Sequence, residues 1–413
     1  MMASVFSASA QLTKERIASD PGLANGVHHS YSPQDLRDTP APKGYKPFYI
    51  SHVGRHGSRY DLGDGYAYQE ASRVLHKADS ARILTSQGME VMRQVDLMKD
   101  ASDGMWEMLT QRGAREHRGI ASRMMSRFPL VFSMKERDEV DAVSSTVQRC
   151  VLSMSNFLLQ VGGQKPGMKI TMDTGSRYMR YLMVWDSRGR SQQKTVRPDS
   201  KKWLQENLDP SRLMSVLFTD PVKAASFSDP YDICENLYDC SSYTETMDLE
   251  SVVNIQSIFS LDELWTLACN ESDVFYAENG PSLLYGEVTG QQGRAMLRDI
   301  VAKADAALSA GSKRAADLRF THDTALLPLA TLMGFSGMDI RLPQLQAHEQ
   351  WCSGDMIPMG SNLQIVFYRS RKSQDVLVKV LYNEKERTFR GLTAVEGPYY
   401  RWNELREYLL GKC

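Results

Sequence analysis

Two arginines flank a histidine in the segment Arg55-His56-Gly57-Ser58-Arg59, which directly follows a short apolar run. Guanidinium groups are planar and present paired N–H donors that suit the oxygens of phosphate or carboxylate groups. Fixed positive charge on both sides opposes the binding of a metal cation by this histidine. Gly57 lets the backbone approach a ligand closely or adopt a positive φ. The segment therefore predicts an anion-binding site that contains a histidine.

Two other polar segments also follow strand-like runs, Ser144 to Arg149 and His322-Asp323. Ligands of open α/β sheets bind beyond the carboxyl ends of the strands, so the three segments meet if their strands are neighbours. Together they supply three arginines, two histidines and one carboxyl group. This set suits phosphoryl transfer: arginines stabilise the phosphoryl oxygens, and a neutral imidazole attacks phosphorus. The carboxyl group then protonates the leaving alkoxide and later activates water.

The elements that must position these groups alternate between strands and helices, which predicts an α/β core with parallel strands. Between about 180 and 300, apolar residues recur at helical spacing and strands are hard to find, so this stretch is predicted to be a mostly helical insertion. Ser144 to Thr146 can cap the helix that follows them. Strands are expected at 46–53, 139–143, 169–172, 317–321, 362–368 and 376–381, and helices at 69–100, 114–128, 147–160, 291–308, 324–332 and 404–410.

These patterns divide the chain into three parts. We expect an N-terminal arm at 1–43, an α/β catalytic core formed by 44–178 and 300–413, and a helical cap at 179–299. A chain of 413 residues is long enough to bury a sizeable core.

Composition excludes several classes of protein. The net charge of −1 provides no global basic field for nucleic acid or an anionic membrane. No apolar run reaches the length of a membrane-spanning helix. The six cysteines form no CxxC pair and no zinc-like spacing, so no metal site is predicted. Cys234 and Cys240 lie close enough to form a disulfide, although unpaired thiols fit the sequence equally well.

The segment Arg55 to Tyr60 resembles the RHGxRx motif of the histidine acid phosphatases, the phytase-containing branch of the histidine phosphatase superfamily. Residues 109–113 (LTQRG) are similar to the LTxxG segment of this family. Residues 145–150 are similar to its distal-arginine helix, and 321–324 match its late His-Asp pair. The resemblance extends over about residues 45–400 and is most like the multiple inositol polyphosphate phosphatase subgroup.

The resemblance implies a fold and a set of roles. The fold is a three-layer α/β domain around a mixed, mostly parallel sheet of the phosphoglycerate-mutase-like type, with a smaller helical cap. His56 is implied as the nucleophile and Asp323 as the proton donor, while the phosphate ligands are Arg55, Arg59, Arg149 and His322. Members of the family need no metal or other cofactor. The implied partner is a small phosphate ester, and the implied location is periplasmic or secreted, although residues 1–11 lack the pattern of a secretory leader.

The sequence departs from the phytase pattern after Tyr60. Asp61 stands where the family often has proline, and Leu62-Gly63-Asp64 replaces a segment in which phytases often carry a lysine. The multiple inositol polyphosphate phosphatases commonly have His-Ala-Glu where this chain has His-Asp. A sugar phosphatase of the glucose-1-phosphatase kind or a broad acid phosphatase therefore remains an alternative to an inositol polyphosphate phosphatase. A non-catalytic protein that binds phosphorylated ligands is an alternative of another class, and a phosphate mutase fits less well.

Several residues near the motifs are candidates for a substrate pocket. Ser58 and Tyr60 belong to the first motif, whereas Arg177 and Arg180 follow the strand at 169–172 and fit a polyanion contact or a solvated face equally well. The histidine pair at 28–29 is expected on a solvated arm. His52 is expected to be a core histidine, because it lies within the predicted strand.

Overall fold

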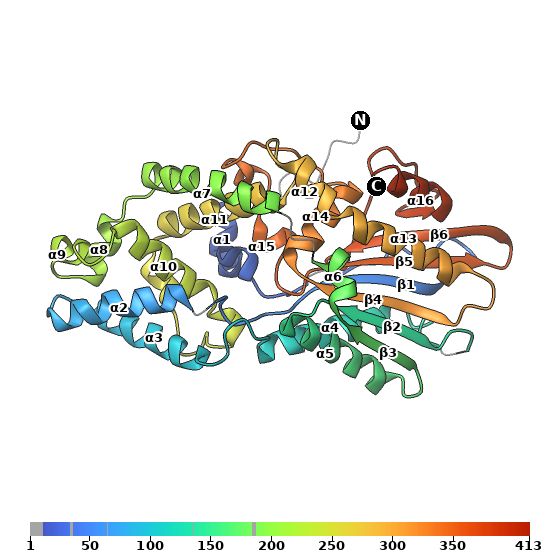
Figure 1. The fold of residues 1–413 in the computed structure, drawn as a ribbon, viewed down its shortest axis with the longest axis horizontal. Helices are drawn as coiled ribbons and strands as arrows, with labels where there is room; N and C mark the ends of the chain where they lie inside the picture. The colour runs from blue at the N-terminus through green and yellow to red at the C-terminus, as the bar shows by residue number, and fades with distance from the viewer. Residues whose placement is uncertain (1–10, 34–35, 64, 134, 184–186) are drawn as a thin grey trace.

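The computed structural model describes residues 11–33, 36–63, 65–133, 135–183 and 187–413. Residues 1–10 and 34–35 of the predicted arm lie outside this range. The described chain has an elongated shape in Figure 1, with the β-sheet in one half and a group of helices in the other. No helix among the described residues is long and apolar enough to span a membrane.

The strands form one mixed sheet, in the order β3-β2-β4-β1-β5-β6-β7 with β8 paired to β6. The strands from β3 to β1 are parallel, whereas those from β5 onward add as antiparallel strands. Antiparallel pairing occupies more of the sheet than expected, because the late strands follow one another through turns. The bounds are β1 (Lys46–Arg55), β2 (Glu139–Ser144), β3 (Lys169–Thr174), β4 (Arg314–Thr321), β5 (Asn362–Ser370), β6 (Ser373–Tyr382), β7 (Lys385–Arg387) and β8 (Tyr399–Arg401).

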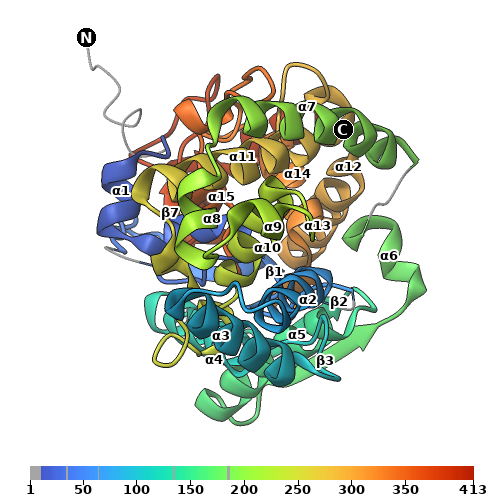
Figure 2. The same ribbon diagram turned by 90° about the vertical axis from the view of Figure 1, so that its left-hand side faces the viewer.

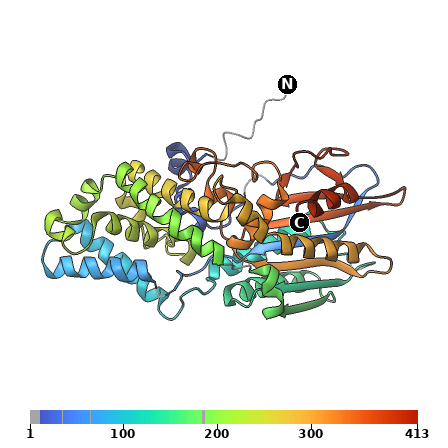
Figure 3. The ribbon, with the colours of Figure 1, turned by 45° about the horizontal axis from the view of Figure 1, so that its top comes forward.

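Helices cover both faces of the sheet and give three layers (Figures 1 and 3). Successive strand residues point to opposite faces. Ile50 of β1 therefore packs with α4 (Gln111–Arg127) and α5 (Gln148–Gln164). Its neighbour Tyr49 belongs to the opposite apolar cluster, with α13 (Arg294–Leu308), α14 (Asp323–Met333) and α16 (Trp402–Leu410). This three-layer architecture around a mixed sheet confirms the predicted fold class.

The other half of the molecule is helical, and Figure 2 looks onto it. One apolar cluster joins helices from distant parts of the chain, including three α-helices that precede β2. Residues 66–102, which the sequence division assigned to the core, therefore pack with the cap helices, and the domain boundaries stay a prediction. The helices are α1 (Lys14–Ser19), α2 (Tyr66–Ser80), α3 (Ser86–Ser102), α7 (Ser187–Asn207), α8 (Ser211–Leu217), α9 (Pro221–Ala225), α10 (Pro230–Ser242) and α11 (Leu261–Asn279), with 3-10 helices η1 (Pro21–His28), η2 (Glu245–Met247) and η3 (Ile255–Ile258).

Short helices join these parts. They are α6 (Ser176–Leu182), α12 (Gly286–Gln292) and α15 (Ser353–Met356), with the 3-10 helix η4 (Ala347–Glu349). The described part of the N-terminal arm is tied down by buried charges of the late strands. Lys379, whose side chain is 1% exposed, pairs with Asp38, and Tyr31 donates a hydrogen bond to the buried Glu384. The arm is therefore packed structure and not a solvated extension.

Most expected elements occur with slightly different bounds, and two details differ. The expected helix at 69–100 is two helices, because the chain turns between Ala81 and Thr85. Ser144 to Thr146 do not cap α5, whose N-cap is Val147 and has no side-chain cap bond. All six cysteines are free thiols, and Cys234 and Cys240 lie within the single helix α10.

Candidate active site

The three predicted segments meet at one edge of the sheet. β4 lies between β1 and β2 and is parallel to both. Arg55 at the end of β1 is in register with Thr321 of β4, and Ser144 at the end of β2 is in register with Phe320. The carboxyl ends of the strands therefore place the His56 loop, the start of α5 and His322-Asp323 side by side, as expected.

His56 is buried and held in one tautomer. Its backbone N–H donates to Thr321 O at 2.9 Å, and its Nδ1 lies 2.9 Å from Gly57 O. A carbonyl oxygen only accepts, so Nδ1 carries the proton and Nε2 keeps its lone pair. Burial, followed by the charges of Arg55 and Arg149, lowers the pKa of His56 well below its ordinary value. The imidazole is therefore neutral, which is the form that a nucleophile requires.

Arg55 is fully buried and oriented by the chain around it. Its Nη1 donates to the carbonyl oxygens of Val27 at 2.7 Å and Ile357 at 2.5 Å. Its Nη2 lies 2.5 Å from Asp323 Oδ2. These partners fix the plane of the guanidinium group, since two carbonyls and a carboxylate define its three contact directions.

Three arginines around His56 each have a buried Nε donor without a partner among the described residues. Nε of Arg55, Arg59 and Arg149 forms no hydrogen bond within the described part of the chain. Their positive charges all act on His56, so the three groups surround the same imidazole. Buried polar groups are normally hydrogen-bonded, and unpartnered cationic donors around one histidine form a site for an anion.

His322 and Asp323 come from the start of α14. The rings of His322 and His56 have centroids 5.5 Å apart, and Ser145 Oγ lies 3.2 Å from His322 Nε2. Burial, followed by Arg149, lowers the pKa of His322 to about 3. Burial acts to raise the pKa of Asp323, but the charges of Arg55 and Arg59 hold it below its usual range. The site thus contains two neutral imidazoles and one carboxylate paired with an arginine.

The loop after His56 is held by α4. Gly57 and Gly113 are packed so closely that a Cβ on Gly57 would lie 2.6 Å from Gly113 O. Ser58 N and Ser58 Oγ each donate to the buried carboxylate of Glu116 at 2.7 Å. Gly57 N donates to Ser153 Oγ of α5 at 3.1 Å. The close approach explains why both positions are glycine, and Glu116 fixes the loop that carries the histidine.

The four pocket candidates differ in their positions. Ser58 is buried and engaged by Glu116, so it supports the loop. Tyr60 is half-buried, with its N–H bonded to Met108 O. Arg177 lies on the exposed face of α6, paired with Asp173, and Arg180 is exposed on the same helix. Neither α6 arginine is brought into the arginine cluster around His56.

The expectation of a solvated arm at His28 and His29 is wrong. The His28 ring stacks on Tyr243 with centroids 4.1 Å apart, and its Nε2 lies 2.9 Å from the Tyr243 hydroxyl. The same hydroxyl accepts a hydrogen bond from Arg59 at 3.2 Å. His29 Nδ1 lies 3.3 Å from Glu245 of the cap. A local sequence pattern cannot predict these contacts, because they join the arm to Tyr243 and Glu245, which are more than two hundred residues away.

Glu107 is a second residue that the sequence analysis missed. Its Oε2 lies 3.2 Å from Arg149 Nη1, and its Oε1 accepts a hydrogen bond from Gly63 N at 3.2 Å. Its backbone has φ 65, a left-handed conformation that is uncommon for residues other than glycine. No group of three or more His, Cys, Asp or Glu that could hold a metal occurs within the ranges described.

Comparisons with known proteins agree with this geometry. The multiple inositol polyphosphate phosphatase of Bifidobacterium longum, solved with inositol hexasulfate, is 21% identical over 94% of this chain and 97% of that chain, with a TM-score of 0.80. A phytase from D. castellii is 13% identical over 98% and 90% of the two chains, with a TM-score of 0.68. A Hafnia alvei phytase solved with myo-inositol hexakis sulphate is 12% identical over 90% and 98%, with a TM-score of 0.55.

At these identities the structural likenesses show the fold. A comparison with curated protein sequences found no match. A family model, described as histidine phosphatase superfamily (branch 2), matches residues 50–383. This range covers most of the chain and contains all three segments of the candidate site. The chain therefore belongs to branch 2 of the histidine phosphatase superfamily.

Proposed function

We propose that this protein is a phosphomonoesterase that hydrolyses inositol polyphosphates such as phytate through a covalent phosphohistidine on His56. The carrying observation is the neutral, buried imidazole of His56, with a free Nε2 lone pair, among three guanidinium Nε donors that lack partners. A phosphate group supplies the oxygens that these donors need, and it brings phosphorus to the imidazole.

The proposed hydrolysis has two steps, the formation of the phosphohistidine and its hydrolysis. In the first, His56 Nε2 forms a bond to phosphorus, the bond from phosphorus to the ester oxygen breaks, and protonated Asp323 gives its proton to the leaving alkoxide. In the second, the Asp323 carboxylate takes a proton from water, the water oxygen attacks phosphorus, and the P–N bond breaks to release phosphate.

Asp323 must be protonated for the first step, although Arg55 lowers its pKa in the empty site. A bound phosphate dianion places negative charge beside Arg55 and weakens that effect. The pKa of Asp323 therefore rises when substrate binds, which couples protonation of the acid to occupancy of the site.

The polyphosphate substrate is supported by the named ligands of the structural relatives, which carry inositol hexasulfate. The alternative, a sugar phosphatase or broad acid phosphatase, is favoured by a specific observation. Glu107 places a carboxylate on Arg149, and negative charge at this position opposes a highly charged substrate. A non-catalytic binding protein is the alternative of another class.

The test is phosphate release from phytate, glucose 1-phosphate and p-nitrophenyl phosphate, with His56→Ala as the comparison. We expect release from phytate by the wild type, loss of release in the variant, and no effect of a metal chelator. Unchanged release in His56→Ala would disprove the phosphohistidine. Preference for glucose 1-phosphate would support the sugar phosphatase, and phosphate binding without turnover would support the binding protein. The periplasmic or secreted location stays a prediction.

A further inference from the structure

A second cavity lies away from His56, at the opposite end of α14. It has a volume of about 420 Å³ and is bordered by α12, the last turns of α14, the segment 339–341 and the chain after α16. α14 has 11 residues, so the cavity lies about 15 Å along the helix from Asp323. The volume falls within the range of roughly 300–1,000 Å³ that is typical of small-molecule sites.

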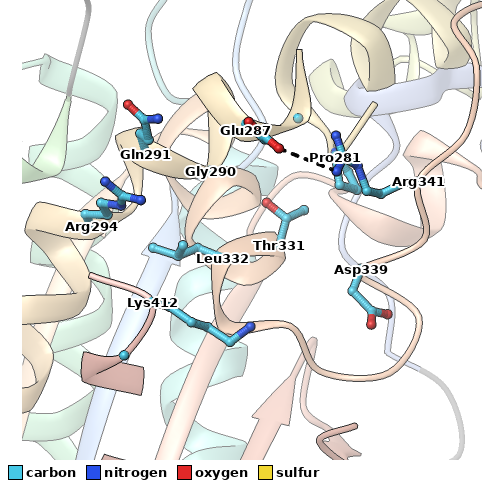
Figure 4. Close-up of a pocket in the computed structure, with 12 residues that line it drawn as sticks. Pro281, Glu287, Gly290, Gln291, Arg294, Thr331, Leu332, Asp339, Arg341 and Lys412 are labelled. Carbon is cyan, nitrogen blue, oxygen red and sulfur yellow. Dashed lines mark ion pairs between the residues drawn. The ribbon is translucent and has the colours of Figure 1, made fainter. Parts of the chain in front are cut away.

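The charges of the cavity wall do not cancel. Its two acids already have cationic neighbours: Glu287 lies 3.9 Å from Arg341, and Asp339 lies 3.5 Å from Arg390. The other two cations, Arg294 and Lys412, form no ion pair with any residue that the structure describes. Figure 4 shows these two on one side of the hollow and the Glu287–Arg341 pair on the other. Lys412 Nζ lies 4.6 Å from the centroid of the Tyr408 ring, which leaves its charge in place. One side of the cavity therefore carries positive charge that no acidic group of the described residues neutralises.

The opposite side of the cavity has paired charges, since Glu287 and Asp339 each lie near an arginine. Thr331 and Leu332 of α14 form the surface between the two sides.

The backbone leaves one wall of the cavity open. Gly290 is buried in α12, yet a Cβ placed on it would meet no atom within 4 Å. The space next to Gly290 is therefore part of the cavity, and a Cβ there would enter it without a clash.

We propose that this cavity binds a small organic anion that carries a phosphate or carboxylate group. This anionic group lies between Arg294 and Lys412. Phosphate and carboxylate share the chemistry that Arg and Lys recognise. The proposal does not depend on phosphatase activity, because none of these residues belongs to the site around His56.

The test is isothermal titration calorimetry of the whole protein with myo-inositol 1-phosphate, which represents a phosphate ester, and with citrate, which represents a carboxylate. Two variants address the cavity: Arg294→Gln combined with Lys412→Gln removes its charge, and Gly290→Leu fills it. Arg371→Gln combined with Lys372→Gln is the matched control, because these are an exposed arginine and lysine in a turn. Arg149→Gln impairs the His56 site alone.

We expect at least one probe to bind to a site that Arg149→Gln leaves intact. The charge-removal and filling variants should weaken that binding by about tenfold or more, which corresponds to about 1.4 kcal/mol. The control pair should bind as the wild type does. Wild-type binding in both cavity variants, or loss of all binding in Arg149→Gln, overturns the proposal. If Gly290→Leu does not fold, as judged by circular dichroism, the double variant decides the question.

Discussion

The proton on His56 Nδ1 decides what this imidazole can do. The hydrogen bond to Gly57 O comes from the adjacent residue, so the tautomer is set locally. In the proposed mechanism the attacking nitrogen is then Nε2, and burial together with the surrounding arginines keeps the ring neutral. The positive charge that would bind a phosphate group thus also opposes protonation of the proposed nucleophile.

Asp323→Asn should separate the two chemical roles of the carboxyl group. The variant cannot protonate a leaving group, so hydrolysis of phytate should slow by about 10²-fold or more. Release of p-nitrophenol should slow much less in the first step, because this leaving group departs without a proton. Burst kinetics with p-nitrophenyl phosphate measure that step alone. Equal losses on both substrates would contradict the role of Asp323 as proton donor.

We expect the carboxylate of Glu107 to compete with the substrate for Arg149. The left-handed backbone of Glu107 costs on the order of 1 kcal/mol, and its carboxylate reaches the guanidinium group of Arg149. Glu107→Gln should lower KM several-fold for phytate and less for p-nitrophenyl phosphate, since removal of one negative charge favours the more charged substrate. Glu90→Gln, an exposed acid of α3 paired with Arg93, is the control. Equal KM values for Glu107→Gln and wild type would rule out this competition.

At the scale of elements, α4 positions the His56 loop through one buried carboxylate. Glu116 accepts hydrogen bonds from Ser58 N, Ser58 Oγ and Tyr31 N, so it joins the loop, the helix and the arm. Burial raises its pKa, and its hydrogen bonds with Ser58 oppose that rise. An amide in its place brings two N–H donors toward groups that also donate.

Glu116→Gln should therefore destabilise the fold by roughly 1–3 kcal/mol and lower kcat more than it raises KM. Urea unfolding and steady-state kinetics measure the two effects. The matched variant Ser58→Ala removes one of the same hydrogen bonds, and the double variant should cost less than the sum of the single ones. Strict additivity would show that Glu116 and Ser58 do not act together.

The sequence predicted those parts of the fold that depend on local pattern. Strand-helix alternation and turn residues located β1, β2 and β4, and the sheet then brought His56, Arg149 and His322 together. The pairing of the arm with Tyr243 and the contact between Glu107 and Arg149 could not be predicted, because they depend on tertiary packing. Ser145 illustrates the same limit: its hydroxyl suits a helix cap, but it bonds His322 instead.

At the scale of the whole molecule, buried neutral histidines predict acid lability. His52 and His117 are completely buried, and burial lowers the pKa of each to about 3. In the unfolded chain these rings titrate near 6.5, so between these values the unfolded state binds more protons. The free energy of unfolding therefore rises with pH across this window, and the protein becomes less stable as the pH falls.

The His117→Leu variant lacks one of these titrating rings, so its unfolded state binds one proton fewer below pH 6.5. As the pH falls below 6.5, the free energy of unfolding of the wild type should therefore decrease by about 1.4 kcal/mol per pH unit more than that of the variant. Urea unfolding at pH 7, 6 and 5 measures the difference. Burial raises the pKa of Asp239 and Glu271 to about 7, which gives the opposite slope in both proteins and cancels in the comparison. Parallel curves for the two proteins would contradict the prediction.

The hydrogen bonds of Arg55 also have a consequence for the order of folding. One carbonyl that holds it precedes it by 28 residues, and the other follows it by 302. β1 itself lies between β4 and β5, which both come from the last hundred residues of the sequence. During synthesis β1 leaves the ribosome long before either neighbour, with both edges unpaired and open to wrong pairing. Such long-range pairing slows folding, so we expect Arg55 to be among the last groups to reach its final position.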